Sequence, residues 1–167
     1  PTNWLVKAGE RWSVSGPNGV GKSTLLNLIT GDHPQAYANN IWLFGKKRGT
    51  GESIWDIKKR IGYVSPEMAQ YFDTRNTCVE VVVGGLFDTL GLFRQPNTEQ
   101  WTLAAKWTRI FGLEKMAHKP FLQLSNAQRR LCLLARAMIK FPPLLLLDEP
   151  CQSLDAHQGQ TEQRDVR

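Results

Sequence analysis

The chain has 167 residues, of which 41% are hydrophobic, and its formal net charge is +6. This composition excludes an intrinsically disordered chain and suits one domain with a hydrophobic core. No apolar run approaches the ~20 residues that a membrane-spanning helix needs, and no secretory signal peptide is visible. The positive charge is compatible with a nucleic-acid partner, but the basic clusters lack interleaved aromatic residues. A solvated surface and a polyanionic nucleotide ligand explain the charge more simply.

The cysteines are Cys78, Cys132 and Cys151, and no pair of them has the spacing of metal ligands or of a redox motif. The histidines form no cluster with them. The sequence therefore predicts thiols that are buried or free in a reducing compartment, and no metal site made by the protein alone.

A glycine-rich loop ending in a lysine lies near the start of the chain. It reads Gly16, Pro17, Asn18, Gly19, Val20, Gly21, Lys22, Ser23 and Thr24, which matches the phosphate-binding pattern G-x-x-x-x-G-K-S. Residues 11–15 before it alternate like a short strand, and residues 25–29 after it have the apolar pattern of a helix. In this context backbone N–H groups and the helix N-terminus bind phosphates. Lys22 is expected to reach the β- and γ-phosphates, and Ser23 to bind Mg²⁺.

Short elements are predicted to follow the first helix, which Gly31 is expected to end. We expect a strand at 41–44, a basic loop at 46–52, one helical turn at 53–59 and a strand at 61–64 that Pro66 ends. Residues 68–123 form a predominantly helical insert. Within it, residues 79–86 fit either a strand or a helix, whereas 97–111 are predicted to be a helix capped by Asn97 or Thr98 and closed by Gly112.

The last third of the chain combines a helix with a very apolar strand. Residues 124–130 lead into a helix whose apolar residues repeat at helical spacing, and Ser125 with Gln128 matches an S-x-x-Q capping box, a purely local structural role. Residues 144–147 are four leucines, which predict a parallel strand buried on both faces. The strand ends in Asp148 and Glu149, at the edge where open α/β sheets bind ligands.

Taken together, these motifs resemble the ATP-binding cassette family of ATPases. Residues 16–24 are similar to the first Walker motif, 144–149 to the second, 124–130 to the family signature and 153–155 to the loop that follows the second Walker motif. Within the family, residues 31–34, 48–65 and 84–93 resemble the ModF/PhrA-like branch, whose members are described as molybdate-transport or photorepair ATP-binding proteins.

The resemblance implies two cofactors, ATP and Mg²⁺. It implies that Ser23 and Asp148 hold Mg²⁺, and that Glu149 is the general base that polarises the attacking water. It also implies that Ser125 and Gln128 contact nucleotide, because in the family the helix after the signature points at the γ-phosphate bound by the opposite protomer. This role is compatible with the capping box, because both use unpaired N–H groups at the start of the helix.

The resemblance further implies an α/β fold: a P-loop NTPase core with a mostly parallel sheet flanked by helices, plus a helical insert. We expect residues 1–66 and 129–167 to form the core and 67–128 to form the helical subdomain with the signature, within one nucleotide-binding domain over 1–167. We also expect the domain to be incomplete, because the family's adenine-stacking aromatic residue and switch histidine fall outside residues 1–167.

Two departures from the family pattern concern the site. Asn126 and Ala127 stand where the signature usually has glycines, and Pro66 falls where a glutamine usually follows the strand.

We predict an ATPase that works as a head-to-tail pair of cassettes, cytoplasmic or peripheral at the membrane, driving transport with permease subunits. Two alternatives stay open. One is a soluble cassette that acts on nucleic acid, through Lys46, Lys47 and Arg48, or on a macromolecular complex. The other is a weakly hydrolysing nucleotide switch.

Overall fold

The computed structural model describes residues 4–33, 36, 39–72, 75–91 and 94–149. Its helices and strands are, in chain order, α1 (Lys22–Thr30), β1 (Trp42–Leu43), β2 (Lys46–Lys47), α2 (Ile54–Lys59), β3 (Ile61–Val64), α3 (Cys78–Val83), α4 (Thr98–Ile110), α5 (Asn126–Met138) and β4 (Leu144–Leu147). Short 3-10 segments connect them: η2 (Pro66–Tyr71), η3 (Gly84–Leu86), η4 (Glu114–Met116) and η5 (Phe121–Gln123).

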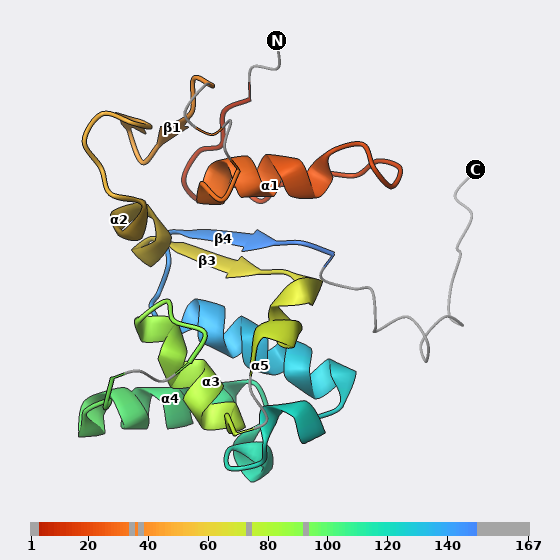
Figure 1. Cartoon of the computed structure of the whole chain (residues 1–167), viewed down its shortest axis with the longest axis vertical. Coiled ribbons are helices and arrows are strands. Elements are labelled where there is room, and N and C mark those ends of the chain that lie inside the picture. Colours follow the sequence, from red (N-terminus) through yellow and green to blue (C-terminus); the bar gives the residue numbers. More distant parts are fainter. Residues whose placement is uncertain (1–3, 34–35, 37–38, 73–74, 92–93, 150–167) are drawn as a thin grey trace.

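A parallel pair of strands lies between two layers of helices (Figure 1). β3 and β4 pair in register, with Ile61 opposite Leu144 and Val64 opposite Leu147. α1 covers one face of the pair, where Leu26 packs with Leu146 in a small apolar cluster. α5 covers the other face, together with α3 and α4, and this side holds the larger core. The chain therefore has the α/β layering that the sequence predicts.

Capping boxes fix the starts of α2 and α4, as they do for α3 and α5. Before α2, the hydroxyl of Ser53 accepts from the N–H of Asp56 at 3.2 Å, and the Asp56 carboxylate accepts from the N–H of Ser53 at 3.3 Å. Before α4, Asn97 and Gln100 exchange the same pair of bonds at 2.9 Å each. These local contacts satisfy N–H groups that would otherwise lack partners, so the predicted turn at 53–59 and the predicted helix at 97–111 both form.

The segment that fits either a strand or a helix is helical. Thr77 and Glu80 form a capping box at the start of α3, in which the N–H of Thr77 donates to Glu80 at 2.7 Å. The glycines that follow allow close packing, since a Cβ atom added at Gly85 would lie 2.1 Å from the carbonyl oxygen of Arg136 on α5. The buried guanidinium of Arg136 donates to the carbonyls of Val81 at 3.0 Å and Thr89 at 2.9 Å. The capping box and the packing against α5 together explain why this segment forms a helix and not a strand.

Lys140, just after α5, fastens that helix to two other segments. Its ammonium donates to the carbonyl of Lys58 at the end of α2, at 2.7 Å, and forms an ion pair with Asp88 after η3. Burial lowers the pKa of Lys140, and the hydrogen bond and charge of Asp88 oppose that shift. The C-terminal end of α5 is thereby attached to both the sheet side and the helical side of the molecule.

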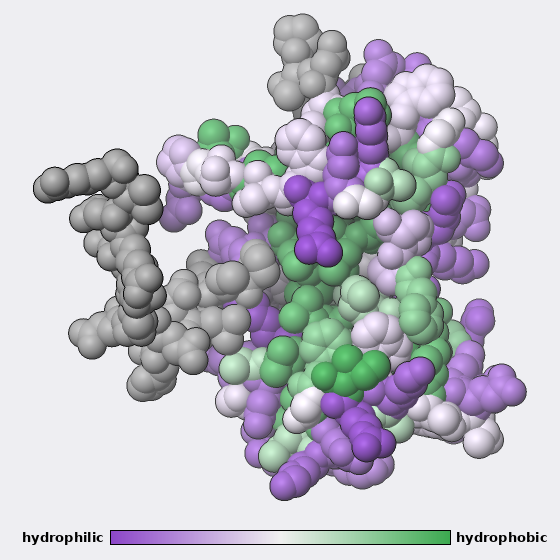
Figure 2. Space-filling view, turned by 180° about the vertical axis from the view of Figure 1, so that it is seen from behind, coloured by the Kyte–Doolittle hydropathy of each residue, from purple (hydrophilic) through white to green (hydrophobic). Residues whose placement is uncertain are grey.

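Three predicted features differ from the structure. Residues 11–15 form no strand, and Lys46 and Lys47 form β2, antiparallel to β1, rather than lying in a loop. Leu145 and Leu147 are each 37% exposed, because among the described residues β4 pairs with β3 alone. Figure 2 shows hydrophobic residues gathered at the height of this sheet on one face of the molecule. A strand beside β4 would be needed to bury both faces, as the prediction assumed.

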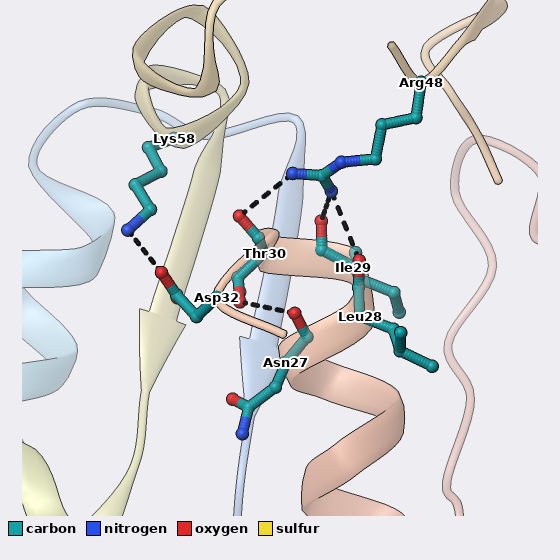
Figure 3. Close-up of polar contacts among 7 residues, drawn as sticks. All are labelled: Asn27, Leu28, Ile29, Thr30, Asp32, Arg48 and Lys58. Carbon is teal, nitrogen blue, oxygen red and sulfur yellow. Dashed lines mark hydrogen bonds and ion pairs between the residues drawn. The ribbon is translucent and has the colours of Figure 1, made fainter. Parts of the chain in front are cut away.

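Arg48 caps the end of α1 instead of facing solvent (Figure 3). Its guanidinium donates to the carbonyls of Leu28 at 3.2 Å, Ile29 at 2.6 Å and Thr30 at 3.5 Å. Arg48 is only 4% exposed. The burial of Arg48 counts against the alternative in which it contacts nucleic-acid phosphates, since its guanidinium binds the carbonyl groups at a helix C-terminus.

Candidate functional site

The glycine-rich loop leads directly into α1, as the sequence predicts. Gly19 and Gly21 have φ angles of 82° and 96°, a left-handed conformation that residues with a Cβ atom rarely adopt. Gly21 is the N-cap of α1, and neither a capping side chain nor an acidic residue occupies the first turn. The N–H groups at the start of α1 are thus left for an anion to bind.

Lys22, the first residue of α1, folds its side chain back over the loop. Its ammonium donates to the carbonyl of Gly16 at 2.8 Å and to that of Pro17 at 2.9 Å. These bonds place a positive charge beside the N–H groups of the loop. A cation and N–H groups converging on one spot fit the negative charge of a polyphosphate.

The two predicted carboxylates lie at the carboxyl end of β4. The N–H of Asp148 donates to the carbonyl of Val64 at 2.8 Å, which extends the pairing with β3 by one residue. Asp148 as a whole is 8% exposed. Carboxylate oxygens are the ligands that Mg²⁺ prefers, so a carboxylate at this end of the strand fits a bound Mg²⁺.

Glu149 adopts an unusual backbone conformation next to that carboxylate. Its φ angle is 45°, in the left-handed region, although it carries a Cβ atom. Such a conformation costs on the order of 1 kcal/mol or more and occurs preferentially at functional sites. The Glu149 side chain is exposed, so it can reach a ligand from outside the sheet.

Tyr63 is a residue of this edge that sequence reasoning missed. It is half-buried on β3, and burial raises the pKa of its phenol, an effect that the hydrogen bond with Ser65 opposes and the charges of Asp148 and Glu67 reinforce. The phenol therefore stays protonated and can donate a hydrogen bond. The signal in the sequence was the i, i+2 spacing of Tyr63 and Ser65 at the end of a strand, which puts both on one face.

The position where the family has a glutamine begins a 3-10 segment. Ser65 is buried, Pro66 starts η2, and Glu67 is exposed in its first turn. A shallow hollow separates this segment from the start of α5, and its lining includes Ser65, Pro66, Asn126 and Arg129. No amide side chain therefore stands at this position, as expected from the sequence.

The signature residues form the predicted capping box at the start of α5. The Ser125 hydroxyl accepts from the N–H of Gln128 at 3.2 Å, and the Gln128 side chain accepts from the N–H of Ser125 at 3.0 Å. α1 and α5 lie on opposite faces of the sheet, and both begin on the side toward which β3 and β4 point (Figure 1). The chain thus brings the loop and the carboxylates together at one edge, whereas the sheet separates the start of α5 from the loop. Pro150 and the predicted loop at 153–155 lie outside the described residues.

Comparisons with known proteins give the same fold and family. A family model described as "ABC transporter" matches residues 1–152. The ABC transporter ATP-binding protein ModF of Escherichia coli (strain K12) is 49% identical over 154 residues, which cover 92% of this chain and 31% of ModF. The manganese transport system ATP-binding protein MntB of Bacillus subtilis (strain 168) is 31% identical over 151 residues, covering 90% of this chain and 58% of MntB.

A solved structure shares the architecture. It is a dimeric, post-hydrolysis state of the ATP-binding cassette MJ0796 bound to ADP and Pi, and it superposes with a TM-score of 0.71 at 26% identity, covering 92% of this chain and 66% of that one. The chain thus spans about a third of ModF and between half and two thirds of MntB and MJ0796. The predicted P-loop fold class is confirmed, and the chain belongs to the ATP-binding cassette (ABC) transporter family of ATPases.

Proposed function

We propose that this chain binds Mg-ATP and hydrolyses it as one member of a head-to-tail pair of cassettes that drives a transport process. The observation that carries the proposal is the loop before α1, where left-handed glycines, free N–H groups and the Lys22 ammonium converge. Residues 16–24 would bind the phosphates of ATP. Nucleotide binding and phosphoryl transfer need this positioning and charge neutralisation more than covalent chemistry.

The two carboxylates have different environments and therefore different proposed roles. Asp148 is buried and, with the hydroxyl of Ser23 at the start of α1, would hold Mg²⁺, which neutralises phosphate charge when bound. Glu149 is exposed and follows directly, so it would accept the proton of the attacking water as general base. Tyr63 would donate a hydrogen bond at the same edge.

The separation of the start of α5 from the loop supports a pair of cassettes. Ser125 and Gln128 cap α5 on the far face of the sheet, so this start of α5 would contact the ATP of a second cassette rather than that of its own chain. The dimeric state of MJ0796 agrees with this arrangement for that protein. We also propose the division into a core of residues 1–66 and 129–167 and a helical subdomain of 67–128, which α5 would connect because it crosses the boundary.

The contacts of the basic residues favour a role in transport over a role in binding nucleic acid. Arg48 is buried at the end of α1, and Lys46 lies 3.6 Å from the carboxylate of Glu52. One of the three cations proposed to contact nucleic acid, Arg48, is therefore engaged within the fold, and the exposed Lys46 has an acidic neighbour. The printed names of ModF and MntB are those of transport ATP-binding proteins, and we infer the same class here.

A location on the cytoplasmic side of a membrane is part of this proposal. None of the helices in the described part of the chain is both long and apolar enough to cross a bilayer. The chain would reach the membrane by binding separate permease subunits.

Replacing Lys22 with alanine tests nucleotide binding. The change removes the ammonium from the loop, so we expect the affinity for ATP, measured by calorimetry on the full-length protein, to fall about 10- to 100-fold. Lys115→Ala, which removes an exposed lysine of η4, is the control and should bind ATP as the wild type does. Equal affinities for the Lys22 variant and the wild type would refute the phosphate-loop assignment.

Replacing Ala127 with glycine tests the departure in the signature. The change removes a methyl group where the backbone of α5 would approach a phosphate, so ATP-dependent pairing or phosphate release should rise. Stability should fall slightly, by about 0.5–1 kcal/mol, because glycine is unfavourable in a helix. Asn126→Gly should do less, since Asn126 is exposed. If neither pairing nor turnover changes, the signature does not limit activity and Ser125 acts as a helix cap alone.

A further inference from the structure

Two cysteines that are far apart in the sequence meet between α3 and α5. Cys78 is the first residue of α3 and Cys132 lies in the middle of α5, and their sulfur atoms are 3.5 Å apart. Both side chains are fully buried. The thiol of Cys132 also lies 3.4 Å from the carbonyl oxygen of Cys78. The fold therefore creates a thiol pair that the linear spacing of the cysteines did not reveal.

We propose that Cys78 and Cys132 are a reversible modification site, at which a peroxide oxidises the two thiols to a disulfide that joins α3 to α5. A disulfide bond is about 2.05 Å long, so the sulfur atoms must approach by roughly 1.5 Å to form it. This inference concerns the packing of the helices and does not depend on nucleotide chemistry.

The reaction balances with a peroxide as the only co-reactant. The Cys78 thiolate attacks one peroxide oxygen, the O–O bond breaks, and water leaves after the second oxygen takes a proton, which gives a sulfenic acid at Cys78. The Cys132 sulfur then attacks the Cys78 sulfur, the S–O bond breaks and a second water leaves. Two electrons pass from the two sulfurs to the peroxide, and both thiol protons end in water.

The surroundings of the two thiols favour Cys78 as the residue that reacts first. The hydrogen bond between the two thiols lowers the pKa of the Cys78 thiol, and burial opposes this shift only in part. Burial raises the pKa of the Cys132 thiol, and its contact with Cys78 raises it further. In this proposal Cys78 is the attacking thiolate and Cys132 the resolving thiol.

The disulfide would restrain the helical side of the molecule rather than rearrange it. Cys78 and Cys132 are 54 positions apart, and the segment between them contains α4. α3 and α5 already pack in one core cluster when both thiols are free. The bond would keep these helices together during local opening and would reduce the freedom of the unfolded chain.

The experiment treats purified full-length protein with hydrogen peroxide, blocks the remaining thiols under denaturing conditions and maps disulfides after tryptic digestion. We expect peptide 76–94 joined to peptide 131–136, with the mass of two hydrogens lost, and reversal by dithiothreitol. The oxidised protein should melt roughly 5–15 °C higher than the reduced protein. Because both thiols are buried, the cross-link should form more slowly than the oxidation of an exposed thiol.

Two variants provide the controls. Cys151→Ser should still form the cross-link, whereas Cys132→Ala should lose both the linked peptide and the peroxide-dependent rise in melting temperature. The assignment would be overturned if Cys78 and Cys132 are still alkylated after the peroxide treatment. It would also be overturned if the cross-links involve Cys151 instead. If the linked peptide forms but the melting temperature does not change, the disulfide does not restrain α3 and α5 as proposed.

Discussion

Replacement of Glu149 by glutamine is expected to lower the rate of ATP hydrolysis by roughly 10²- to 10⁴-fold, the range for loss of a general base. Glutamine has the same length and can donate and accept hydrogen bonds, but it cannot take a proton from the attacking water. Glu149 is exposed, so the change leaves no buried group without a partner. ATP affinity should stay within a few-fold of the wild type, and paired cassettes should accumulate with ATP still bound.

The measurements are phosphate release and ATP binding on the full-length protein, made side by side. Glu114→Gln is a matched control, because Glu114 is an exposed glutamate at the start of η4 and far along the chain from the carboxyl end of β4. That control should hydrolyse ATP at the wild-type rate. Turnover by the Glu149 variant at the wild-type rate would show that another group accepts the proton.

Replacement of Arg48 by methionine should reduce the free energy of unfolding by about 2–4 kcal/mol, although Arg48 is no part of the nucleotide site. Methionine retains much of the volume but cannot donate to the carbonyls of Leu28, Ile29 and Thr30. The carbonyl oxygens of Leu28, Ile29 and Thr30 would then lie beside a buried methionine and would lose the hydrogen-bond donor that Arg48 provides. The positive charge that opposes the helix dipole at the end of α1 would also disappear.

Lys47→Met is the matched control for this prediction. It removes the same charge one residue earlier, but Lys47 is exposed on β2, so the free energy of unfolding should change by less than about 0.5 kcal/mol. Urea denaturation of the two variants and the wild type, at equal ionic strength, measures the difference. Equal midpoints for the Arg48 and Lys47 variants would mean that the cap of α1 contributes no stability.

The features that the sequence predicted correctly depend on neighbours in the chain. The loop before Lys22, the capping box of Ser125 and the helix after Asn97 each arise from residues a few positions apart. The strand at β4 was also predicted, because four leucines followed by carboxylates are typical of a buried strand that ends at a ligand site. Local propensity and pattern suffice where both partners of an interaction lie within one turn or one strand.

The features that it missed depend on partners far along the chain. Arg48 belongs to a run of basic residues, which predicts a surface position, yet it is buried against a helix that ends 18 residues earlier. Cys78 and Cys132 approach only because α3 packs on α5. The exposure of Leu145 reflects which strands lie beside β4, which no property of the leucine run itself determines.

Lys140 joins the C-terminal end of α5 to α2 and to the segment after η3, and Ser125 lies at the opposite end of the helix. Its 13 residues span roughly 20 Å at the helical rise of 1.5 Å per residue. A rotation of only about 10° around the Lys140 end would therefore displace the opposite end, where Ser125 lies, by about 3 Å, the length of one hydrogen bond. An angular change of this size at the Lys140 end of α5 would therefore be enough to make or break a contact at the Ser125 end.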